Sequence, residues 1–282
     1  IPGVHHIGQP YWFDEGGDMD IDDFGRQRAL ELEQAIDEIG EDRVAAFIAE
    51  PIQGAGGVII PPATYWPEVA RICQERDILF VADEVICGFG RLGEWYGSQY
   101  FGLKPDLVTM AKGISSGYLP VGAVGMTENV AQGLMGASEF AHGYTYSGHP
   151  TCCAAALENI ATLEREDIVT RVKDHTAMVW SQKLAQLQEH PIVGEVDTAG
   201  LLGKIELVPE KGKSRKRFDA YGRVGTLARD HSFRNGVVLR AVRDTLIACP
   251  PLIISDSEID WLVECTWKTL DQTMADVKGE MA

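Results

Sequence analysis

The sequence lacks several features that would assign it to common protein classes. None of its six cysteines form a C-x-x-C pair, which argues against a structural zinc site and a disulfide framework. It has no apolar run long enough to span a bilayer. His5, His6, His142 and His149 show no metal-ligand spacing, so no metal site is predicted. From these absences we expect a cytoplasmic protein with reduced cysteines and no membrane partner.

Basic residues are also scarce relative to acidic ones. The chain has 25 Lys and Arg against 42 Asp and Glu, which gives a formal net charge of −17 at pH 7. Such a balance disfavours nucleic acids and anionic membranes as partners. The segment EKGKSRKRFD (210–219) is locally basic. On this acidic background we interpret it as a solvated surface loop rather than as a nucleic-acid site.

The sequence does have alternating strand-like and helix-like segments. Hydrophobic residues make up 45% of 282 residues, enough to bury the core of one large or two medium domains. Apolar runs at 43–50, 78–85 and 107–111 with helical periodicity between them predict an α/β fold with a mostly parallel sheet covered by helices. Further predictions are helices at 26–39, 66–76, 151–166, 168–189, 224–235 and 256–281, strands at 121–126 and 192–208, and a hairpin at 237–253.

Polar residues follow three of the predicted strands. Glu50, Asp83 and Lys112 each fall where a strand ends, and ligands gather at the carboxyl ends of parallel strands. Because Lys112 follows an apolar run and precedes Gly113, we expect its amine to point into a cleft. A lysine beside an acid suits Schiff-base chemistry with a carbonyl cofactor, since the acid can keep a pyridinium nitrogen protonated. The spacing alone leaves a surface ion pair open as the alternative.

The amino-acid sequence around Asp83 and Lys112 resembles that of a known family. FVADEVICGFGRLGEW (80–95) and PDLVTMAKGISSGYLPVGAV (105–124) resemble the class III aminotransferases, which have fold type I and depend on pyridoxal phosphate. Within them the chain looks most like the ω-transaminases, also called amine–pyruvate aminotransferases. The resemblance runs from IPGVHHIGQPYW near residue 1 to the C-terminus. It implies that 1–155 form part of a large cofactor-binding domain and that 156–282 form a small α+β C-terminal domain.

The resemblance also implies roles for the residues at the strand ends. Lys112 matches the Schiff-base lysine, which, once released by the substrate amine, moves a proton between substrate and cofactor carbons. Asp83 matches the partner of the pyridinium nitrogen. Val85, two residues further along the predicted strand and therefore on the same face, packs under the ring. Glu50 orients neighbouring polar groups or has a structural role.

Other matching positions concern the cofactor phosphate and the substrate. Tyr144 and Thr145 match the segment that binds the phosphate from the partner subunit, which implies a homodimer with shared active sites. Arg240 matches the mobile arginine that clamps a substrate carboxylate, with a surface ion pair as the alternative. Where ornithine and γ-aminobutyrate aminotransferases have the glutamate that holds this arginine, the chain has Ala55. Where they have glutamine, it has Ile86. Both changes resemble the amine–pyruvate branch.

Family members carry a further N-terminal piece that supplies a Gly-Ser turn for the phosphate and an aromatic that stacks on the ring. The sequence begins with Ile1-Pro2-Gly3, which is typical of the middle of a loop, so we expect it to be part of a longer protein and to have little activity alone. The function implied is transfer of an amino group from a primary amine or ω-amino compound to pyruvate. The alternatives are a class III aminotransferase that uses 2-oxoglutarate and a non-catalytic fragment of such an enzyme.

Overall fold

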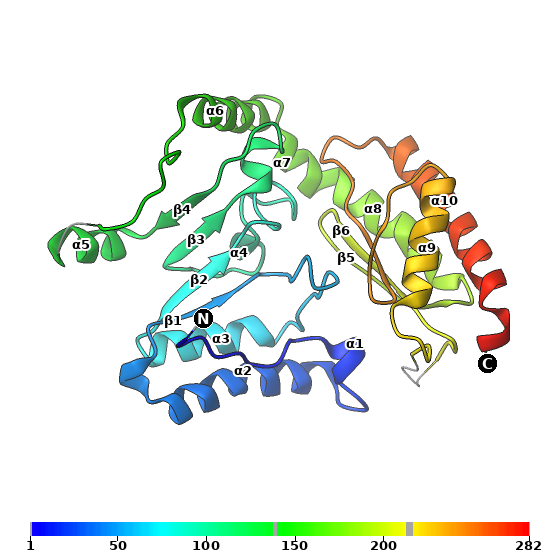
Figure 1. The fold of residues 1–282 in the computed structure, drawn as a ribbon, viewed down its shortest axis with the longest axis horizontal. Coiled ribbons are helices and arrows are strands. Elements are labelled where there is room, and N and C mark those ends of the chain that lie inside the picture. The colour runs from blue at the N-terminus through cyan, green and yellow to red at the C-terminus, as the bar shows by residue number, and fades with distance from the viewer. Residues whose placement is uncertain (1, 138–139, 213–216, 282) are drawn as a thin grey trace. The chain divides into compact units, whose positions relative to one another are not determined.

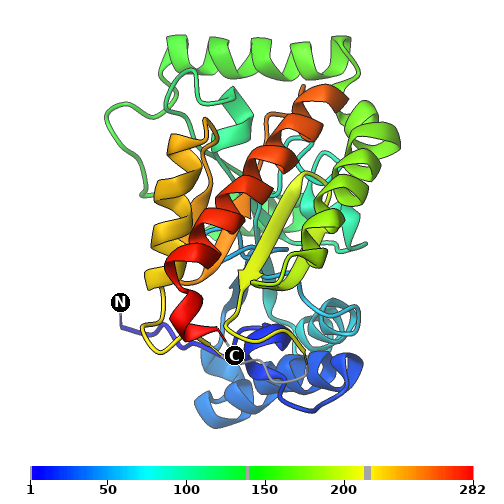
Figure 2. The same cartoon turned by 90° about the vertical axis from the view of Figure 1, so that its right-hand side faces the viewer.

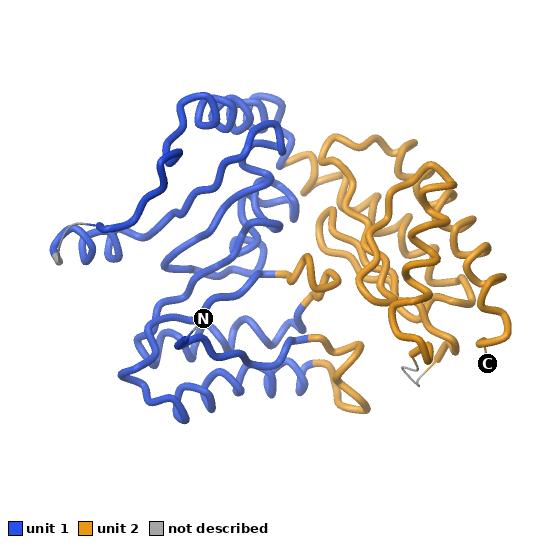
Figure 3. Tube along the Cα trace, in the orientation of Figure 1, with its two compact units in different colours: residues 1–10, 22–51, 61–169 blue, residues 11–21, 52–60, 170–282 orange. Residues whose placement is uncertain are grey.

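The computed structural model describes residues 2–137, 140–212 and 217–281 (Figure 1). The chain divides into two compact units, coloured in Figure 3. The first unit consists of 1–10, 22–51 and 61–169, and the second of 11–21, 52–60 and 170–282. The predicted domain boundary between 155 and 156 stays a prediction.

The first unit is built on a four-stranded sheet in the order β1-β2-β3-β4. Strands β1, β2 and β3 are parallel, whereas β4 runs antiparallel to β3. The strand bounds are Ala46–Ala49, Leu79–Asp83, Leu107–Met110 and Ala123–Met126, in chain order. The predicted mostly parallel sheet is confirmed, with each strand shorter than its apolar run.

Two helices cover one face of this sheet (Figure 1). Helix α2 (Ile21–Ile39) and helix α3 (Tyr65–Glu75) bury their apolar stripes against β1 and β2. Along β1 the side chains alternate, because Phe47 and Ala49 pack into this core whereas Ile48 is 61% exposed. Helix α2 begins five residues before the predicted start, since two aspartates in its first turn complement the helix dipole.

The remaining elements of the first unit are short except for one helix. They are α4 (Gly97–Tyr100), α5 (Glu128–Ala137) and α6 (Pro150–Arg165). Helix α6 matches the helix predicted at 151–166. Its first residue is Pro150, which suits this position because the first turn needs no N–H donor from that residue.

The second unit contains an antiparallel sheet in the order β5-β6-β8-β7. The strands are β5 (Val193–Ala199), β6 (Leu202–Leu207), β7 (Arg240–Val242) and β8 (Thr245–Ala248). The predicted strand at 192–208 is therefore a hairpin of two strands that turns at Gly200, where φ is +53°. The hairpin predicted at 237–253 is confirmed as β7 and β8.

Helices cover one face of the antiparallel sheet. In Figure 2, α10 (Asp256–Asp276) lies between α9 (Arg223–Arg234) and α8 (Ala177–Leu184), and it packs against both. Trp180 of α8 is fully buried in the shared core. The Ser255 hydroxyl accepts the N–H of Glu258 and so caps the start of α10. The described residues also form the short helices α1 (Trp12–Glu15) and α7 (Ile168–Arg171), together with 3₁₀ or π segments at 41–43, 112–115, 172–176, 185–189 and 278–280.

The second unit also holds a set of hydrogen-bonded polar side chains that we call the buried network: Tyr11, Asp14, Glu206, Arg217 and Thr245. Glu206 is fully buried and accepts hydrogen bonds from Thr245 Oγ1 (2.8 Å), Arg217 Nη1 (3.2 Å) and the Tyr11 hydroxyl. Arg217 Nη2 also donates to Asp14 Oδ1 at 2.7 Å. The Arg217 side chain is only 17% exposed, so the prediction that 210–219 is a solvated loop is wrong at this residue. Lys213, Arg215 and Lys216 of that loop lie outside the described residues.

No helix among the described residues is both long enough and apolar enough to cross a membrane.

Candidate active site

The carboxyl ends of three parallel strands bring Glu50, Asp83 and Lys112 to one edge of the first sheet, and we call this group the strand-end site. Glu50 follows the last residue of β1, Asp83 is the last residue of β2, and Lys112 comes two residues after β3. The strand pairing places them at the same edge because β1, β2 and β3 all run in one direction. The sequence-based placement of all three at strand ends is therefore confirmed.

Asp83 closes its strand with a local turn. Its Oδ1 accepts the backbone N–H of Val85 at 3.1 Å, which orients the carboxylate. Among the described residues, Oδ2 has no hydrogen-bond partner and remains open to an incoming donor. Because the strand ends at Asp83, Val85 and Ile86 lie in the following turn, and the prediction that Val85 continues the strand on the same face is wrong.

Glu84 is a residue of this region that the sequence analysis missed. Its side chain is fully buried, and its two carboxylate oxygens accept the backbone N–H groups of Gly97 (2.7 Å) and Ser98 (2.6 Å). Burial raises the pKa of this carboxyl, while the hydrogen bonds from Ser98 and Gly97 oppose the rise. Glu84 therefore ties the end of β2 to the start of α4. An acid next to Asp83 in an apolar run was the only available signal.

Lys112 begins a tight turn, the 3₁₀ helix Lys112–Ser115. Its φ of +43° is left-handed, a conformation that lysine rarely adopts and that marks a locally strained backbone. Gly113 allows the turn to approach the 88–89 backbone, since a Cβ there would lie 3.0 Å from Phe89 Cβ. The Lys112 side chain is exposed among the described residues, so the prediction that its amine points into a cleft is wrong for this chain.

Tyr144 and Thr145 lie in a turn that precedes α6, within the same unit as Lys112. Tyr144 is 77% exposed and Thr145 is also exposed. The turn is closed by two hydrogen bonds, since Ser147 N–H donates to Tyr144 O at 3.0 Å and Tyr144 N–H donates to Ser147 Oγ at 3.1 Å. The structure thus presents both residues on a compact, outward-facing turn.

The two predicted substrate residues belong to the second unit. Ala55 lies in the loop bridged by Gln53 and Ile59, and Arg240 is the first residue of β7. The strand starts only at Arg240 because the N–H of the preceding Leu239 donates to Ser232 Oγ instead of joining the sheet. Arg240 is exposed and makes no ion pair with any described residue, which removes the surface-ion-pair alternative within the described chain.

The model of the family "Aminotransferase class-III" matches residues 11–270. The chain belongs to the class-III aminotransferases.

Three relatives show how much of a class-III aminotransferase the chain represents. The putrescine–pyruvate aminotransferase of Pseudomonas aeruginosa is 54% identical over 277 residues, which cover 98% of this chain and 60% of that protein. The diaminobutyrate–2-oxoglutarate transaminase of Halomonas elongata is 35% identical over 96% of this chain and 60% of its own length. The solved omega transaminase from Pseudomonas jessenii in complex with PMP has a TM-score of 0.93 and 37% identity, covering 99% of this chain and 62% of that chain. The chain therefore spans about 60% of these relatives.

The donor set at the strand-end site fits the pyridine end of pyridoxal phosphate. Asp83 Oδ2 is an open acceptor for a ring N–H, and the Lys112 amine makes no hydrogen bond with any described residue. Thr109, the register partner of Asp83, carries a buried hydroxyl without a hydrogen-bond partner among the described residues. Such unpartnered polar atoms are uncommon in folded proteins and are frequent at ligand sites.

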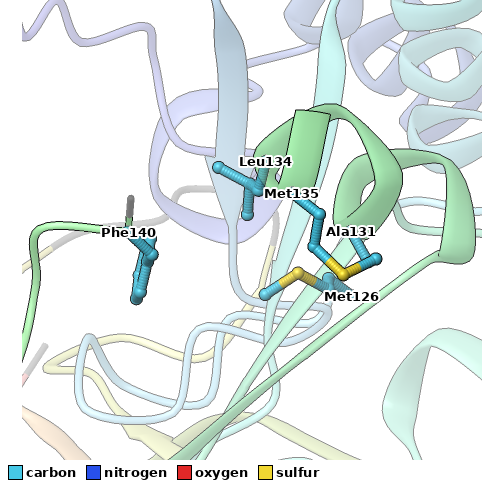
Figure 4. Close-up of a pocket in the computed structure, with 5 residues that line it drawn as sticks. All are labelled: Met126, Ala131, Leu134, Met135 and Phe140. Carbon is cyan, nitrogen blue, oxygen red and sulfur yellow. The ribbon is translucent and has the colours of Figure 1, made fainter. Parts of the chain in front are cut away.

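An apolar pocket elsewhere in the first unit does not have this chemistry. It has a volume of about 270 Å³ and lies beside β4 and α5 (Figure 4). Its lining contains no titratable side chain and consists of Met126, Ala131, Leu134, Met135 and Phe140. That pocket therefore offers no donor or acceptor for proton transfer, whereas the strand-end site offers both.

Proposed function

We propose that the protein containing this chain is a pyridoxal-phosphate-dependent transaminase that moves an amino group from a primary amine or ω-amino compound to pyruvate. The observation that carries this proposal is the strand-end placement of Lys112 and Asp83, each with a polar atom unpartnered among the described residues. Class-III aminotransferases in general depend on pyridoxal phosphate. Pyruvate as acceptor is supported by the name of the 54% identical relative.

Each residue of the strand-end site then has a defined task. Bound pyridoxal phosphate supplies a carbonyl carbon for amines and an electron sink. The Asp83 carboxylate accepts the ring N–H through Oδ2 and stabilises the protonated ring, while the Val85 N–H fixes the orientation of the carboxylate. The Lys112 amine holds the cofactor between turnovers. With the cofactor bound and the lysine released, the Lys112 amine would serve as the base that takes the proton from the substrate carbon and as the acid that gives it back.

The remaining predicted contacts complete this proposal. Val85 packs under the ring, Ile86 lies beside it and Glu50 orients polar groups at the same edge. Tyr144 and Thr145 bind the phosphate of the cofactor that is held in the partner subunit. The protein therefore acts as a homodimer with shared active sites. Their high exposure in the isolated chain supports this role, because a phosphate ligand that serves a second subunit must face outward.

Substrate selection falls to residues of the second unit. We assign Arg240 to the carboxylate of the 2-oxo acid acceptor, since a guanidinium binds a carboxylate through two parallel hydrogen bonds. Among the described residues Arg240 has no ion-pair partner, and Ala55 supplies no carboxylate to hold it away from substrate. An apolar amine donor would enter when Arg240 moves aside.

An acceptor other than pyruvate is the second candidate. It is favoured by the diaminobutyrate–2-oxoglutarate transaminase, which is 35% identical to the chain. A panel of 2-oxo acids offered to the amine-loaded enzyme separates the two, because each acceptor restores the cofactor's aldehyde form at its own rate. Amine-dependent loss of the cofactor's visible absorbance separates both from a non-catalytic fragment. The cytoplasmic location stays a prediction from the cysteine pattern.

The proposal is tested by replacing Lys112 in the natural protein that contains these residues. Lys112→Ala should abolish transamination and should remove the borohydride-stable link between cofactor and protein. Lys104→Ala, which changes an exposed lysine of the same unit, should keep both. Mass mapping of the reduced wild-type protein should place the cofactor on Lys112. Turnover retained in Lys112→Ala would contradict the assignment.

A further inference from the structure

The turn that carries Lys112 has an unfavourable backbone. Lys112 and Ser116 both have left-handed φ values, +43° and +47°, and Gly117 follows at +75°. Two left-handed non-glycine residues within five positions persist only where the surrounding structure holds them. Two backbone hydrogen bonds of the turn are long, since Ser116 N–H donates to Gly113 O and Gly117 N–H donates to Lys112 O at 3.3 Å each. A shorter bond of 2.7 Å runs from Ser115 Oγ to Leu119 O. Contacts from outside the turn add to these internal bonds in holding its two left-handed residues.

One side chain of α6 supplies these contacts. Asn159 Nδ2 donates to the carbonyl oxygens of Gly113 (2.9 Å) and Ile114 (3.1 Å), and its Oδ1 accepts the Ser116 hydroxyl at 2.6 Å. The orientation of the amide follows from its partners, because carbonyl oxygens accept only and must face the NH₂ group. All three bonds go to the turn that begins at Lys112. Helix α6 packs directly on this turn.

We propose that Asn159 is a positioning residue for Lys112, an inference that rests on the proposed function of Lys112. Asn159 contacts neither the lysine amine nor any reacting atom of the proposed site. It fixes the two carbonyls that follow Lys112 and the hydroxyl that closes the turn, and so sets the direction in which the lysine side chain leaves the backbone. The amine itself stays free to move between the cofactor link and proton transfer.

The geometry makes an isosteric test available. Asn159→Asp keeps the size of the side chain but replaces the donor by a carboxylate oxygen close to two carbonyl oxygens. The new carboxylate oxygen would repel the carbonyl oxygens of Gly113 and Ile114, and the turn should shift. Because displacement of a catalytic group by about 1 Å can cost roughly 100-fold in rate, we expect kcat to fall by about 10- to 100-fold with KM little changed. Ser116→Ala removes only one of the three bonds and should cost less.

The matched control is Asn129→Asp, the same change at an exposed position of α5. It should leave kcat unchanged. Two readouts distinguish positioning from a general loss of structure. Borohydride should still link the cofactor to Lys112 in Asn159→Asp, and the pH at which the visible absorbance of the bound cofactor changes should move relative to wild type. Ser116→Ala should show the same pH movement to a smaller extent and serves if Asn159→Asp fails to fold.

The outcomes separate the two proposals. If wild-type protein links its cofactor elsewhere than Lys112, the proposed function fails and the role of Asn159 fails with it. Suppose instead that the link forms at Lys112 but Asn159→Asp keeps the wild-type kcat and absorbance profile. Then only the role of Asn159 is overturned. If Asn159→Asp does not fold, the same result in Ser116→Ala has the same meaning. A fall in melting temperature without either change would show that Asn159 merely stabilises α6, which also overturns it.

Discussion

The two units of this chain each assemble a group of polar side chains, and the two groups are satisfied to very different degrees. In the buried network, Glu206 is fully buried and accepts three hydrogen bonds from residues of three separate segments. In the strand-end site, Lys112 is exposed and its amine has no hydrogen-bond partner among the described residues, and neither has Asp83 Oδ2.

This difference in hydrogen bonding separates polar side chains with a structural role from those with a functional role. Buried charges persist when they are paired and hydrogen-bonded, as Glu206 and Arg217 are. Donors and acceptors that bind a ligand cannot also be fully hydrogen-bonded to neighbouring side chains. A ligand site is therefore expected to hold polar atoms without protein partners on a well-ordered backbone. On this basis, substitutions in the strand-end site should alter activity, and substitutions in the buried network should alter stability.

The largest effect on activity is expected from a substitution at Asp83 in the strand-end site. Asp83→Asn keeps an acceptor for the Val85 N–H, so the fold should survive. It removes the negative charge that stabilises a protonated ring nitrogen, and turnover should fall by about 10²–10³-fold, as for other preorganised electrostatic groups. Steady-state rates and a melting curve measure both quantities. Asp106→Asn is the control, because Asp106 Oδ2 accepts the Phe80 N–H at 2.9 Å within the sheet. A near wild-type rate in Asp83→Asn would contradict the assignment.

The strand-end site was largely readable from the sequence, whereas its details were not. Short apolar runs followed by Glu50, Asp83 and Lys112 were enough to place these residues at strand ends, because strand length and direction follow from local pattern. The Val85 turn and the fully buried Glu84 were missed. Both depend on where β2 stops. That point is decided by the hydrogen bond that the Glu84 N–H donates to the Thr109 carbonyl and by those that its carboxylate accepts from the Gly97 and Ser98 backbone, rather than by local pattern.

The next effect is expected in the buried network, on stability. Arg217→Met removes the cation beside fully buried Glu206, and loss of one partner of such a pair costs about 3–5 kcal/mol. Burial alone would lower the pKa of Arg217, but the Glu206 and Asp14 charges outweigh it and raise the pKa, so Arg217 is charged in the folded protein. Urea unfolding should show the loss. Activity measured well below the unfolding transition should remain close to wild type.

A surface pair provides the control for Arg217. Arg223 pairs with Glu280, but both side chains are more than two-fifths exposed, at 42% and 41%. Arg223→Met should therefore cost only about 0–1 kcal/mol. The double variant Arg217→Met/Glu206→Gln should recover part of the loss, because no unpaired buried charge remains. Equal losses in Arg217→Met and Arg223→Met would remove the distinction between the network and the surface.

No sequence pattern pointed to the buried network. Tyr11 and Glu206 are 195 positions apart, and Arg217 lay in a segment whose basic composition favoured solvent exposure. Long-range pairs of this kind follow from packing of the second unit around Phe13 and β6, not from periodicity. The guanidinium of Arg217 lies 5.0 Å from the Phe13 ring centre, a cation–π contact between segments far apart in the sequence.

A smaller effect on activity is expected at Arg240. Arg240→Ala removes a bidentate, charge-assisted pair with the acceptor carboxylate, each bond of which is worth roughly 1.5–3 kcal/mol. The pyruvate half-reaction should lose about ten- to several-hundredfold in kcat/KM, whereas single-turnover reaction with the amine should change far less. Arg234→Ala at the exposed end of α9 is the control. Equal losses in both half-reactions would make Arg240 structural.

The smallest effect concerns His190, whose side chain is 1% exposed in the second unit. Its Nδ1 accepts the Ile192 N–H at 3.4 Å, so its Nε2 carries the proton and donates to Asp271 Oδ1 at 3.2 Å. Burial lowers the pKa of this imidazole, although the Asp271 hydrogen bond opposes the shift. Because the folded pKa lies below the unfolded value of about 6.5, the unfolded chain takes up the proton first as the pH falls. The stability contributed by neutral His190 is thus complete above about pH 6.5 and is lost as the pH falls toward the folded pKa. His190→Gln should flatten the slope of unfolding free energy against pH in that window, whereas His5→Gln at an exposed position should not. An unchanged slope in His190→Gln would mean that His190 titrates alike in both states, and that its burial carries no pH dependence.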